Sequence, residues 1–424
     1  MIDPKLIKES PNLIKEMLSR RNVQFPLDEL IDIDKTRRNM IIEKQQLRHS
    51  KNMLAQTIAE KKSHGNEIKD ELAQMERVGK NLNELEKREV IISERFDMLI
   101  RSLPNLLHES VPVGKNSDDN VIIRKYSATN EVKATVKDHI DLSLSLDLLD
   151  LERAAKISGA RFYFLKNELV KMNQALINFA LDFLIEYNYT LVQPPYMIKR
   201  ECLEGSAILD DFKDVIYKIE DEDLYMIGTS EHAMASMHMD EILESSKLPI
   251  RYASISPCFR KEAGAHGKDM KGIFRVHQFE KVEQFVISNP KNSWDEHERM
   301  LKISENFYQK LGIPHQVVLL CTSDLGKVSS KTYDIEAWMP GQMAYREIVS
   351  CSNCTDYQAR RLKIRHRERP DQPTELVHSL NSTLVATERS LVAIMENYQT
   401  DKGTIIIPDV LRKYMNDKTE ISVL

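Results

Sequence analysis

Apolar residues recur every seven positions in two runs between residues 27 and 103. The first run is Ile33, Met40, Leu47 and Leu54, and the second is Met75, Leu82, Phe96 and Leu103, with Glu89 interrupting it. No proline occurs in this stretch, and its glycines are Gly65 and Gly79. A seven-residue repeat aligns apolar side chains along one side of a helix. The pattern therefore predicts two long helices that turn at residues 63–66 and pair as an antiparallel coiled-coil hairpin.

Beyond residue 104 the periodic segments are shorter, and they predict a mixture of helices and strands. Proline, glycine and polar residues between 104 and 160 predict a passage between two domains. An amphipathic helix is predicted at residues 168–187, with strands at 191–195 and 224–227. Alternating residues then predict a β-hairpin. Arg260 and Glu262 share one face of its first strand, residues 263–272 form a polar loop, and residues 273–286 form its second strand.

Composition narrows the class of protein. The chain has 424 residues, 42% of them hydrophobic, which is enough for two or more globular domains. No apolar run of about 18 residues occurs, so no transmembrane helix is expected, and residues 1–10 lack the apolar core of a signal peptide. Five scattered cysteines are typical of a reducing compartment. These features predict a cytoplasmic protein with no membrane partner.

Charge separates the two predicted long helices. The net charge of the whole chain is −5, so a nucleic-acid site would have to be a local basic surface. Residues 31–62 carry eight Lys or Arg against four Asp or Glu, whereas residues 66–103 carry seven against nine. A solvated coiled coil that acts as a spacer explains this pattern, and so does an arm whose first helix contacts RNA phosphates. The candidate RNA contacts are Arg37, Arg38, Lys44, Arg48 and Lys51.

The predicted β-hairpin at residues 259–286 carries groups that suit a nucleotide. A guanidinium such as that of Arg260 matches phosphate geometry. A carboxylate such as that of Glu262 accepts from an adenine amino group, and an aromatic face such as that of Phe279 stacks on a purine. Phe279, Lys281 and Glu283 share one face of the second strand. A charged hairpin with a solvated turn is the simpler interpretation of Arg-x-Glu alone.

The longer string resembles motif 2 of class II aminoacyl-tRNA synthetases, in its seryl-tRNA synthetase form. The matching residues are Phe-Arg-x-Glu at 259–262 and Arg-Val-His-Gln-Phe-Glu-Lys-Val-Glu at 275–283. The resemblance extends from residue 1 to about 415, and the sequences of the motifs are most similar to those of the archaeal and eukaryotic branch. It implies an α+β fold: a catalytic domain on an antiparallel sheet with flanking helices, plus the N-terminal hairpin. The implied domains are 1–110 for tRNA binding, 111–155 as a linker and 156–424 for catalysis.

The resemblance also implies which residues bind serine. Gly-Thr-Ser-Glu-His at 228–232 matches the loop that folds over the amino acid, although a Ser or Thr before a helix is also a common N-cap. By resemblance, Thr229 and Glu231 bind the serine ammonium and Glu283 takes the serine hydroxyl. The implied serine site is Thr229, Glu231, Arg260, Glu283, Asn381 and Thr383.

The remaining motifs imply the ATP site. Residues 346–350 match the segment that supplies two ligands of ATP-bound Mg²⁺, here Glu347 and Ser350, with Glu347 and Val349 on one strand face. Residues 380–389 match motif 3, whose closing arginine is Arg389. The implied ATP site is Arg260, Lys261, Glu262, Arg275, Val276, Phe279, Glu347, Ile348, Val349, Ser350 and Arg389, with Arg260, Glu283 and Arg389 as the catalytic residues.

Cys351 and Cys354 form one C-x-x-C pair, which supplies too few ligands for zinc, so no zinc is expected.

The implied function is ATP-dependent charging of tRNA(Ser) with L-serine through seryl-adenylate, with tRNA(Sec) as a further candidate substrate. In this family the hairpin grips the long variable arm of the tRNA, and the helix and strand at 168–195 resemble motif 1 of a homodimer interface. Two alternatives remain. One is an enzyme of the same fold that activates another amino acid or charges a carrier protein. The other is a coiled-coil interaction protein with an inactive synthetase domain.

Overall fold

The computed structural model describes residues 1–127, 136–208, 214–262 and 272–423, and the chain divides into two compact units, Met1–Pro104 and Asn105–Leu424. The polar loop predicted at 263–272 lies, except for Gly272, outside the described residues. No helix in the described part of the chain combines the length and apolar character needed to cross a membrane.

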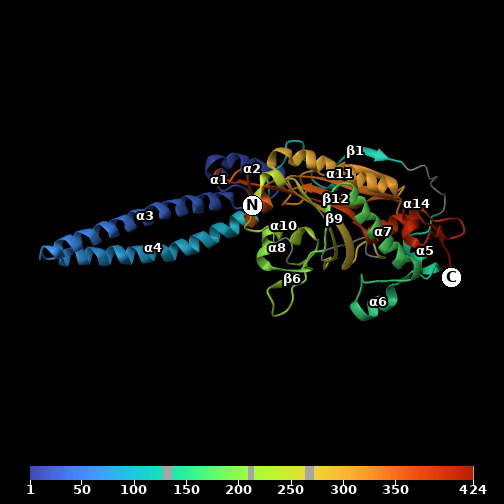
Figure 1. The fold of residues 1–424 in the computed structure, drawn as a ribbon, viewed down its shortest axis with the longest axis horizontal. Helices are drawn as coiled ribbons and strands as arrows, with labels where there is room; N and C mark the ends of the chain where they lie inside the picture. Colours follow the sequence, from blue (N-terminus) through green and yellow to red (C-terminus); the bar gives the residue numbers. More distant parts are fainter. Residues whose placement is uncertain (128–135, 209–213, 263–271, 424) are drawn as a thin grey trace. The chain divides into compact units, whose positions relative to one another are not determined.

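The first unit is dominated by two long helices. It contains α1 Lys5–Glu9, α2 Pro11–Arg20, α3 Leu27–Ser63 and α4 Lys69–Ser102. Figure 1 shows α3 running out to a turn and α4 returning beside it. The predicted coiled-coil hairpin is confirmed, and the turn lies at the residues where the heptad pattern breaks. At 37 residues, α3 is about 55 Å long at 1.5 Å per residue.

The helix–helix seam of this hairpin is polar as well as apolar. Met40, Leu85 and Phe96 are buried in it. Lys44 forms an ion pair with Glu89, the residue that interrupts the second heptad run. The guanidinium of Arg37 lies 4.3 Å from the ring centroid of Phe96. Long cationic side chains therefore complete the seam where leucine or isoleucine is missing.

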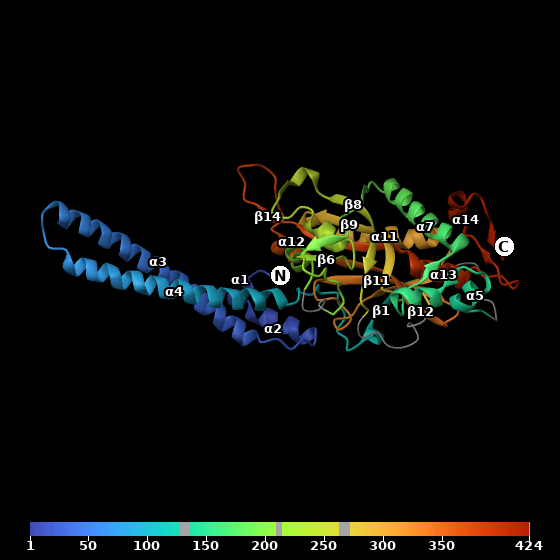
Figure 2. The same ribbon diagram turned by 90° about the horizontal axis from the view of Figure 1, so that it is seen from below.

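The second unit is built on one eight-stranded sheet (Figure 2). Its spatial order is β1-β10-β11-β12-β15-β9-β8-β4, and every neighbouring pair is antiparallel except β4 with β8. In chain order the strands are β1 Val121–Tyr126, β4 Thr190–Val192, β8 Ile250–Phe259, β9 Gln278–Ser288, β10 His315–Leu319, β11 Lys331–Met339, β12 Ala344–Asn353 and β15 His378–Ala386. The predicted antiparallel sheet is confirmed.

Three helices cover the apolar face of the sheet: α7 Asn167–Glu186, α11 Ser293–Lys310 and α13 Thr387–Asn397. Their buried side chains pack with Val282, Val286 and Val349 of the strands in one core. Side chains that alternate with these along the strands point to the opposite face, where polar groups gather. Burying one face of the sheet thus leaves the other face available for chemistry.

Shorter elements complete the second unit. The helices are α5 His139–Ser145, α6 Leu151–Ser158, α8 Arg200–Ser206, α10 Glu231–Ser236, α12 Tyr357–Leu362 and α14 Asp409–Arg412. The strands are β2 Leu149–Asp150, β3 Phe164–Leu165, β5 Met197–Lys199, β6 Leu224–Met226, β7 Ile242–Glu244, β13 Arg365–Arg367, β14 Glu375–Leu376, β16 Ile405–Ile406 and β17 Glu420–Ile421. Part of the segment predicted as a linker, 111–155, joins this unit, because β1 pairs with β10 at the edge of the main sheet.

Two sequence-based expectations about strands are wrong. Strand β8 ends at Phe259, so Arg260 and Glu262 do not share a strand, and Glu262 has a φ of 48°. The returning strand β9 begins at Gln278, because the preceding residues form turns and bends that bury Ile273 and Val276. Glu262 is therefore directed by a left-handed backbone turn rather than by strand alternation.

Candidate active site

The polar face of the sheet forms the floor of a cavity of about 710 Å³ in the second unit. It is lined by most of the residues singled out in the sequence: Thr229, Glu231, Arg260, Glu262, Arg275, Val276, Phe279, Glu283, Glu347, Ile348, Ser350, Asn381, Thr383 and Arg389. Two candidates, Lys261 and Val349, are absent from the described lining. The Lys261 Nζ atom instead lies 5.5 Å from the ring centroid of Tyr217.

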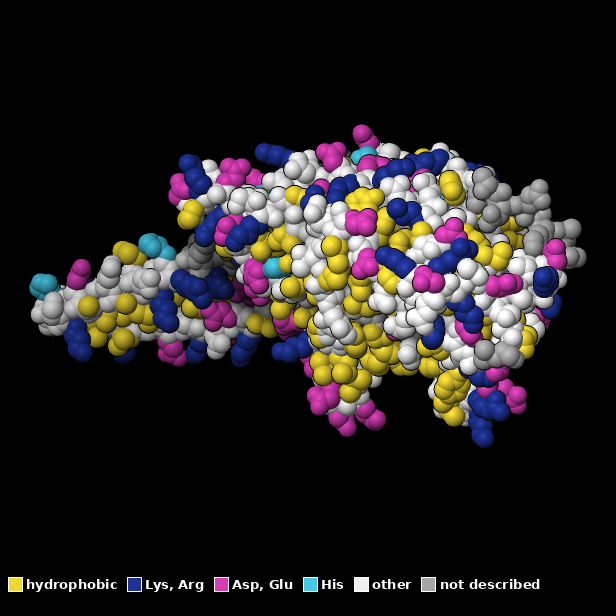
Figure 3. Space-filling view, turned by 45° about the vertical axis from the view of Figure 1, so that its right-hand side comes forward, with side chains coloured by type: hydrophobic (Ala, Val, Ile, Leu, Met, Phe, Trp, Pro, Cys, Tyr) yellow, Lys and Arg dark blue, Asp and Glu magenta, His cyan; other side chains and the backbone are white. Residues whose placement is uncertain are grey.

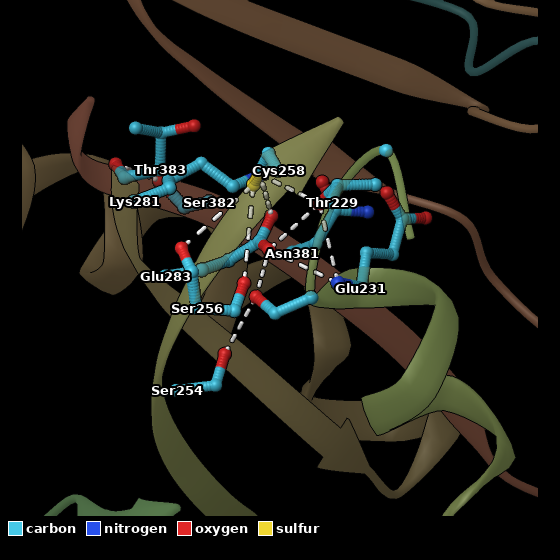
Figure 4. A network of polar contacts seen from close by, with 12 residues as sticks. Thr229, Glu231, Ser254, Ser256, Cys258, Lys281, Glu283, Asn381, Ser382 and Thr383 are labelled. Atoms are coloured by element: carbon cyan, nitrogen blue, oxygen red, sulfur yellow. Dashed lines mark hydrogen bonds and ion pairs between the residues drawn. The ribbon is translucent and has the colours of Figure 1, made fainter. Parts of the chain in front are cut away.

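Glu283 is the centre of the polar network at one end of the cavity (Figure 4). Its Oε2 atom accepts from Thr229 Oγ1 at 2.8 Å, Ser230 Oγ at 2.5 Å and the Glu231 backbone N–H at 3.0 Å. Its Oε1 atom accepts from Lys281 Nζ at 2.9 Å. Burial alone would raise the pKa of Glu283, but the Lys281 charge and the hydroxyl donors outweigh it and lower the pKa.

The segment 228–232 reaches this network from the start of a short helix. Ser230 precedes α10, and its hydroxyl donates to Glu283. Thr229 Oγ1 accepts from the Glu231 N–H at 3.2 Å and also from Lys281 Nζ at 2.6 Å. Ser230 makes no side-chain capping bond to α10. The segment instead directs its side chains to Glu283 and to the cavity, which Thr229 and Glu231 line.

Glu231 has the opposite electrostatic behaviour to Glu283. Burial raises the pKa of Glu231 to about 7, and the neighbouring negative charge of Glu283 contributes to the rise. An ammonium group bound between these two carboxylates would supply the positive charge that Glu231 lacks. The pair is therefore suited to an amino acid with a free amino group.

Arg260 and Phe279 both line the cavity and contact each other. The Arg260 guanidinium lies 5.3 Å from the Phe279 ring centroid, and its Nε donates to the Gly228 carbonyl at 2.9 Å. Arg275 Nη1 donates to Glu262 Oε2 at 3.2 Å. Two guanidinium groups, a carboxylate and an aromatic ring thus lie in one cavity. Together they form a set of groups that can bind a nucleotide.

At the other end of the cavity, Arg389 contacts Glu347. Arg389 Nη1 lies 3.2 Å from Glu347 Oε2 and donates to the Glu347 carbonyl at 2.9 Å. The side chain of Glu347 is 47% exposed. Its partial desolvation in the cavity opposes ionisation, but the charge of Arg389 outweighs it and lowers the pKa of this carboxyl. Asp334 lies opposite Ser350 in the sheet, and burial together with the Glu347 charge raises the pKa of Asp334.

A β-bulge determines which residues of β12 face the cavity. Ile335 pairs with Val349 and Glu336 pairs with Glu347, so Ile348 is the extra residue. Glu347 and Ser350 therefore line the cavity together, while Val349 is buried in the core. The expectation that Glu347 and Val349 share a strand face is wrong, because one extra residue reverses the alternation.

Comparison with known proteins identifies the family. Residues 1–107 match the family model of the seryl-tRNA synthetase N-terminal domain, and residues 216–398 match the tRNA synthetase class II core domain (G, H, P, S and T). A serine–tRNA ligase of Nitrosopumilus maritimus (strain SCM1) is 58% identical over 421 residues, covering 99% of this chain and all of that protein. The chain belongs to the seryl-tRNA synthetase family.

Solved structures of seryl-tRNA synthetases agree over the full length. The crystal structure of the Pyrococcus horikoshii enzyme complexed with ATP has a TM-score of 0.95 and 47% identity, and the match covers 100% of both chains. The cytoplasmic serine–tRNA ligase of Naegleria fowleri in complex with AMP has a TM-score of 0.88 and 38% identity, covering 100% of this chain and 99% of that one. The resemblance to seryl-tRNA synthetases inferred from the motifs is confirmed, as is the class II fold.

Sequence reasoning assigned no role to several polar residues in or behind the cavity of this seryl-tRNA synthetase, among them Ser230, Lys281 and Gln358. Ser230 and Lys281 both bond to Glu283, and Gln358 donates to Glu231 Oε1 at 2.7 Å. Lys281 had a visible signal, because it alternates with Glu283 on one strand face. Gln358 had none, since it lies in α12, between the motifs at 346–350 and 380–389 and outside both.

The cysteine pair lies next to the cavity rather than in it. Cys351 is part of the apolar core, and Cys354 accepts from Asn381 Nδ2 at 3.7 Å. Among the described residues, no group of three or more His, Cys, Asp or Glu is arranged to hold a metal ion.

Proposed function

We propose that this chain activates L-serine with ATP and transfers the seryl group to tRNA, with both steps in the cavity of the second unit. The observation that carries the proposal is the environment of Glu283. A buried carboxylate, with a pKa below its ordinary value, accepts from two hydroxyls and a lysine beside the less acidic Glu231. Such a pair suits a small amino acid with a side-chain hydroxyl.

In the first step the serine carboxylate attacks the α-phosphorus of ATP and pyrophosphate leaves. Arg260 is assigned to the α-phosphate, where negative charge develops, and Glu262 to the adenine amino group. Phe279 stacks on the base, and Arg275 and Arg389 hold the distal phosphates. Val276 and Ile348 contribute wall contacts. Val349 packs in the core behind them, and Lys261 follows Arg260 in the chain. Catalysis then depends on positioning and on charge stabilisation.

In the second step the terminal adenosine hydroxyl of the tRNA attacks the seryl carbonyl, and AMP leaves. Serine is recognised by Thr229, Glu231, Glu283, Asn381 and Thr383. A site built to hydrogen-bond a substrate hydroxyl rejects the analogue that lacks it by about 10⁴–10⁵, because the buried groups are then left unpaired. Alanine should therefore be rejected because it lacks the hydroxyl that Glu283 binds, and not because of its size.

Mg²⁺ fits the donor set at the Arg389 end of the cavity. The bulge in β12 brings the Glu347 carboxylate and the Ser350 hydroxyl to the same face. Two protein oxygens together with phosphate oxygens suit this ion, which seldom has a cage made only by protein. When bound with ATP, Mg²⁺ would neutralise phosphate charge. No role for zinc is proposed.

The N-terminal hairpin is proposed to bind the long variable arm of tRNA(Ser). Figure 3 shows lysine and arginine side chains along this arm, with acidic ones between them. Of the five candidates, Arg37 and Lys44 contact Phe96 and Glu89 in the seam. Arg48 and Lys51 are the exposed candidates, although Arg48, whose side chain is 58% exposed, also pairs with Glu86 of α4 at 3.0 Å. Arg38 is half-buried and pairs with Asp34 of its own helix at 2.8 Å. Charging of tRNA(Sec) with serine remains a prediction.

A homodimer is proposed on the basis of α7 and β4. Strand β4 is an edge of the main sheet, and it exposes Leu191, while α7 exposes Ile185. An edge strand presents unpaired backbone N–H and C=O groups with which a second chain can pair. A cytoplasmic location is proposed because all five cysteines are free. The domain roles proposed are tRNA binding for 1–110 and catalysis for 156–424.

The test is exchange of pyrophosphate into ATP without tRNA, run separately with serine, threonine, alanine and cysteine. Exchange with serine alone is expected. Exchange with another amino acid would keep the fold and overturn the serine assignment. No exchange with any of the four, from folded protein, would favour an interaction protein with an inactive synthetase domain. Transfer to a carrier protein but not to tRNA would overturn the second step.

A further inference from the structure

Gln358 is a buried amide that joins three parts of the cavity wall. It lies in α12, and its side chain is enclosed. Its Nε2 donates to Glu231 Oε1 at 2.7 Å and to the Ser206 carbonyl, at the end of α8, at 2.9 Å. Its Oε1 accepts from Ser379 Oγ, in β15, at 2.6 Å. Every polar atom of this amide therefore has a partner.

These partners also determine which way the amide points. A backbone carbonyl only accepts hydrogen bonds, so the NH₂ group must face Ser206 and, with its second hydrogen, Glu231. The amide oxygen is then left for the Ser379 hydroxyl. A flipped amide would place its oxygen against the Ser206 carbonyl and the Glu231 carboxylate, which is repulsive. The amide is thus held in one orientation, as a donor to Glu231.

Glu231 needs such a donor. It stands beside the ionised Glu283, and both burial and that charge favour its protonated form. The hydrogen bond from Gln358 acts in the opposite direction, since it stabilises the carboxylate. Ser206 and Glu231 both line the cavity, whereas Gln358 lies behind them. Gln358 therefore reaches the substrate only through Glu231 and the end of α8.

We propose that Gln358 is a positioning residue for serine: it directs the Glu231 carboxylate toward the substrate ammonium and joins it to the end of α8. This inference rests on the proposed assignment of Glu231 to the ammonium. It makes the residue specific to the amino acid, because its hydrogen bonds go to the serine end of the cavity. None of these hydrogen bonds goes to Arg389 or Glu347, the residues assigned to the ATP phosphates and Mg²⁺.

The test is Gln358→Met, which keeps the length of the side chain and removes its donors. Pyrophosphate exchange should show a KM for serine raised about tenfold or more, as expected for a lost hydrogen bond to a charged group, with the KM for ATP nearly unchanged. Because Glu231 then ionises at higher pH, the ratio of variant to wild-type kcat/KM for serine should recover as the pH rises from 7 to 9. Gln358→Glu should be worse, since it adds a carboxylate.

The matched control is Gln284→Met. Gln284 is also a buried glutamine of this unit, and its Nε2 donates to Ser304 Oγ at 2.9 Å and to the Met300 carbonyl at 3.2 Å in α11. This variant is expected to lose stability without a shift in the pH profile for serine. A double-mutant cycle with Glu231→Gln adds a second criterion. In that background Gln358→Met should have little further effect on the KM for serine.

Several outcomes would overturn the inference. They are a folded Gln358→Met with unchanged serine KM and pH profile, an equal rise in the KM for ATP, or additive effects in the cycle. If Gln358→Met does not fold, Ser379→Ala is measured in the same way, and an unchanged serine KM there would overturn the inference. Failure of the proposed function is recognised separately, because the wild-type protein would then show no exchange that depends on serine.

Discussion

Lys281 and Glu283 are two residues apart on β9 and form an ion pair of 2.9 Å within the sheet. Both side chains are buried, at 7% and 2% exposure. Lys281 Nζ also donates to Thr229 Oγ1 at 2.6 Å, so the pair is joined to the loop before α10. An ionised carboxylate with a fixed counter-ion can accept a hydroxyl hydrogen bond without having to lose its own proton first.

Lys281→Met should destabilise the protein and impair serine activation. Removal of one partner of a buried ion pair leaves an unpaired charge and typically costs about 3–5 kcal/mol. Urea unfolding measures the loss, and pyrophosphate exchange measures the activity. The double variant Lys281→Met/Glu283→Gln should regain part of the stability but not the activity. If the single variant were as stable as wild type, the pair would not be buried as described.

Glu283→Ala is expected to abolish exchange with serine in protein that is less stable, because Lys281 loses its buried partner, but still folded. The variant loses the acceptor for the serine hydroxyl and leaves Lys281, Thr229 and Ser230 without their shared partner. Circular dichroism checks the fold, and ATP binding checks that the rest of the cavity is intact. Unchanged turnover with serine would contradict the assignment of Glu283.

Serine affinity should depend on pH through Glu231. The pKa of this carboxyl is raised to about 7 by burial and by Glu283, so the fraction ionised falls as the pH drops below 7. Only the ionised form attracts an ammonium, and the KM for serine should therefore rise between pH 8 and pH 6. The KM for ATP serves as the internal control. Glu231→Gln should remove this pH dependence, and its persistence in that variant would assign the titration to another group.

Glu347→Gln should raise the Mg²⁺ concentration needed for half-maximal exchange. The substitution removes the negative charge of the proposed ligand and its ion pair with Arg389. Titration of Mn²⁺ with a non-hydrolysable ATP analogue, followed by electron paramagnetic resonance, reports binding without turnover. Glu298→Gln is the control, because Glu298 lies in α11 and interacts with Lys331. Equal Mn²⁺ affinity in wild type and Glu347→Gln would contradict the assignment.

Arg48→Ala and Lys51→Ala should weaken tRNA charging and leave pyrophosphate exchange without tRNA unchanged. Each lost phosphate contact should reduce the slope of log K against log salt by about 0.9 in duplex RNA, by analogy with B-DNA. The matched control is Arg88→Ala, an exposed arginine on α4. If Arg88→Ala weakened charging as much as the α3 variants, the contact surface would not be specific to α3.

Periodicity and motifs predicted the parts of this protein that depend on local order. The heptads located α3, α4 and their turn, because a seam must repeat every 3.5 residues whatever surrounds it. Most of the residues selected by the resemblance of 259–284, 346–350 and 380–389 to known motifs line the cavity. The ion pair between Lys44 and Glu89, which both interrupt the apolar repeat, could not be predicted in this way, because the two residues are 45 positions apart in the chain.

The tertiary structure decided the details that depend on neighbouring strands. Bulges at Ile348 in β12 and at Leu384 in β15 arise from pairing with β11 and β9, and each reverses the face to which the following residues point. Glu347 and Ser350 meet for this reason, although their spacing of three places them on opposite faces of a regular strand. Gln358 meets Glu231 only because α12 and α10 pack together. The sequence by itself determined which chemical groups and long helices this protein has, and folding alone decided which groups face one another, because register and packing depend on residues far apart in the chain.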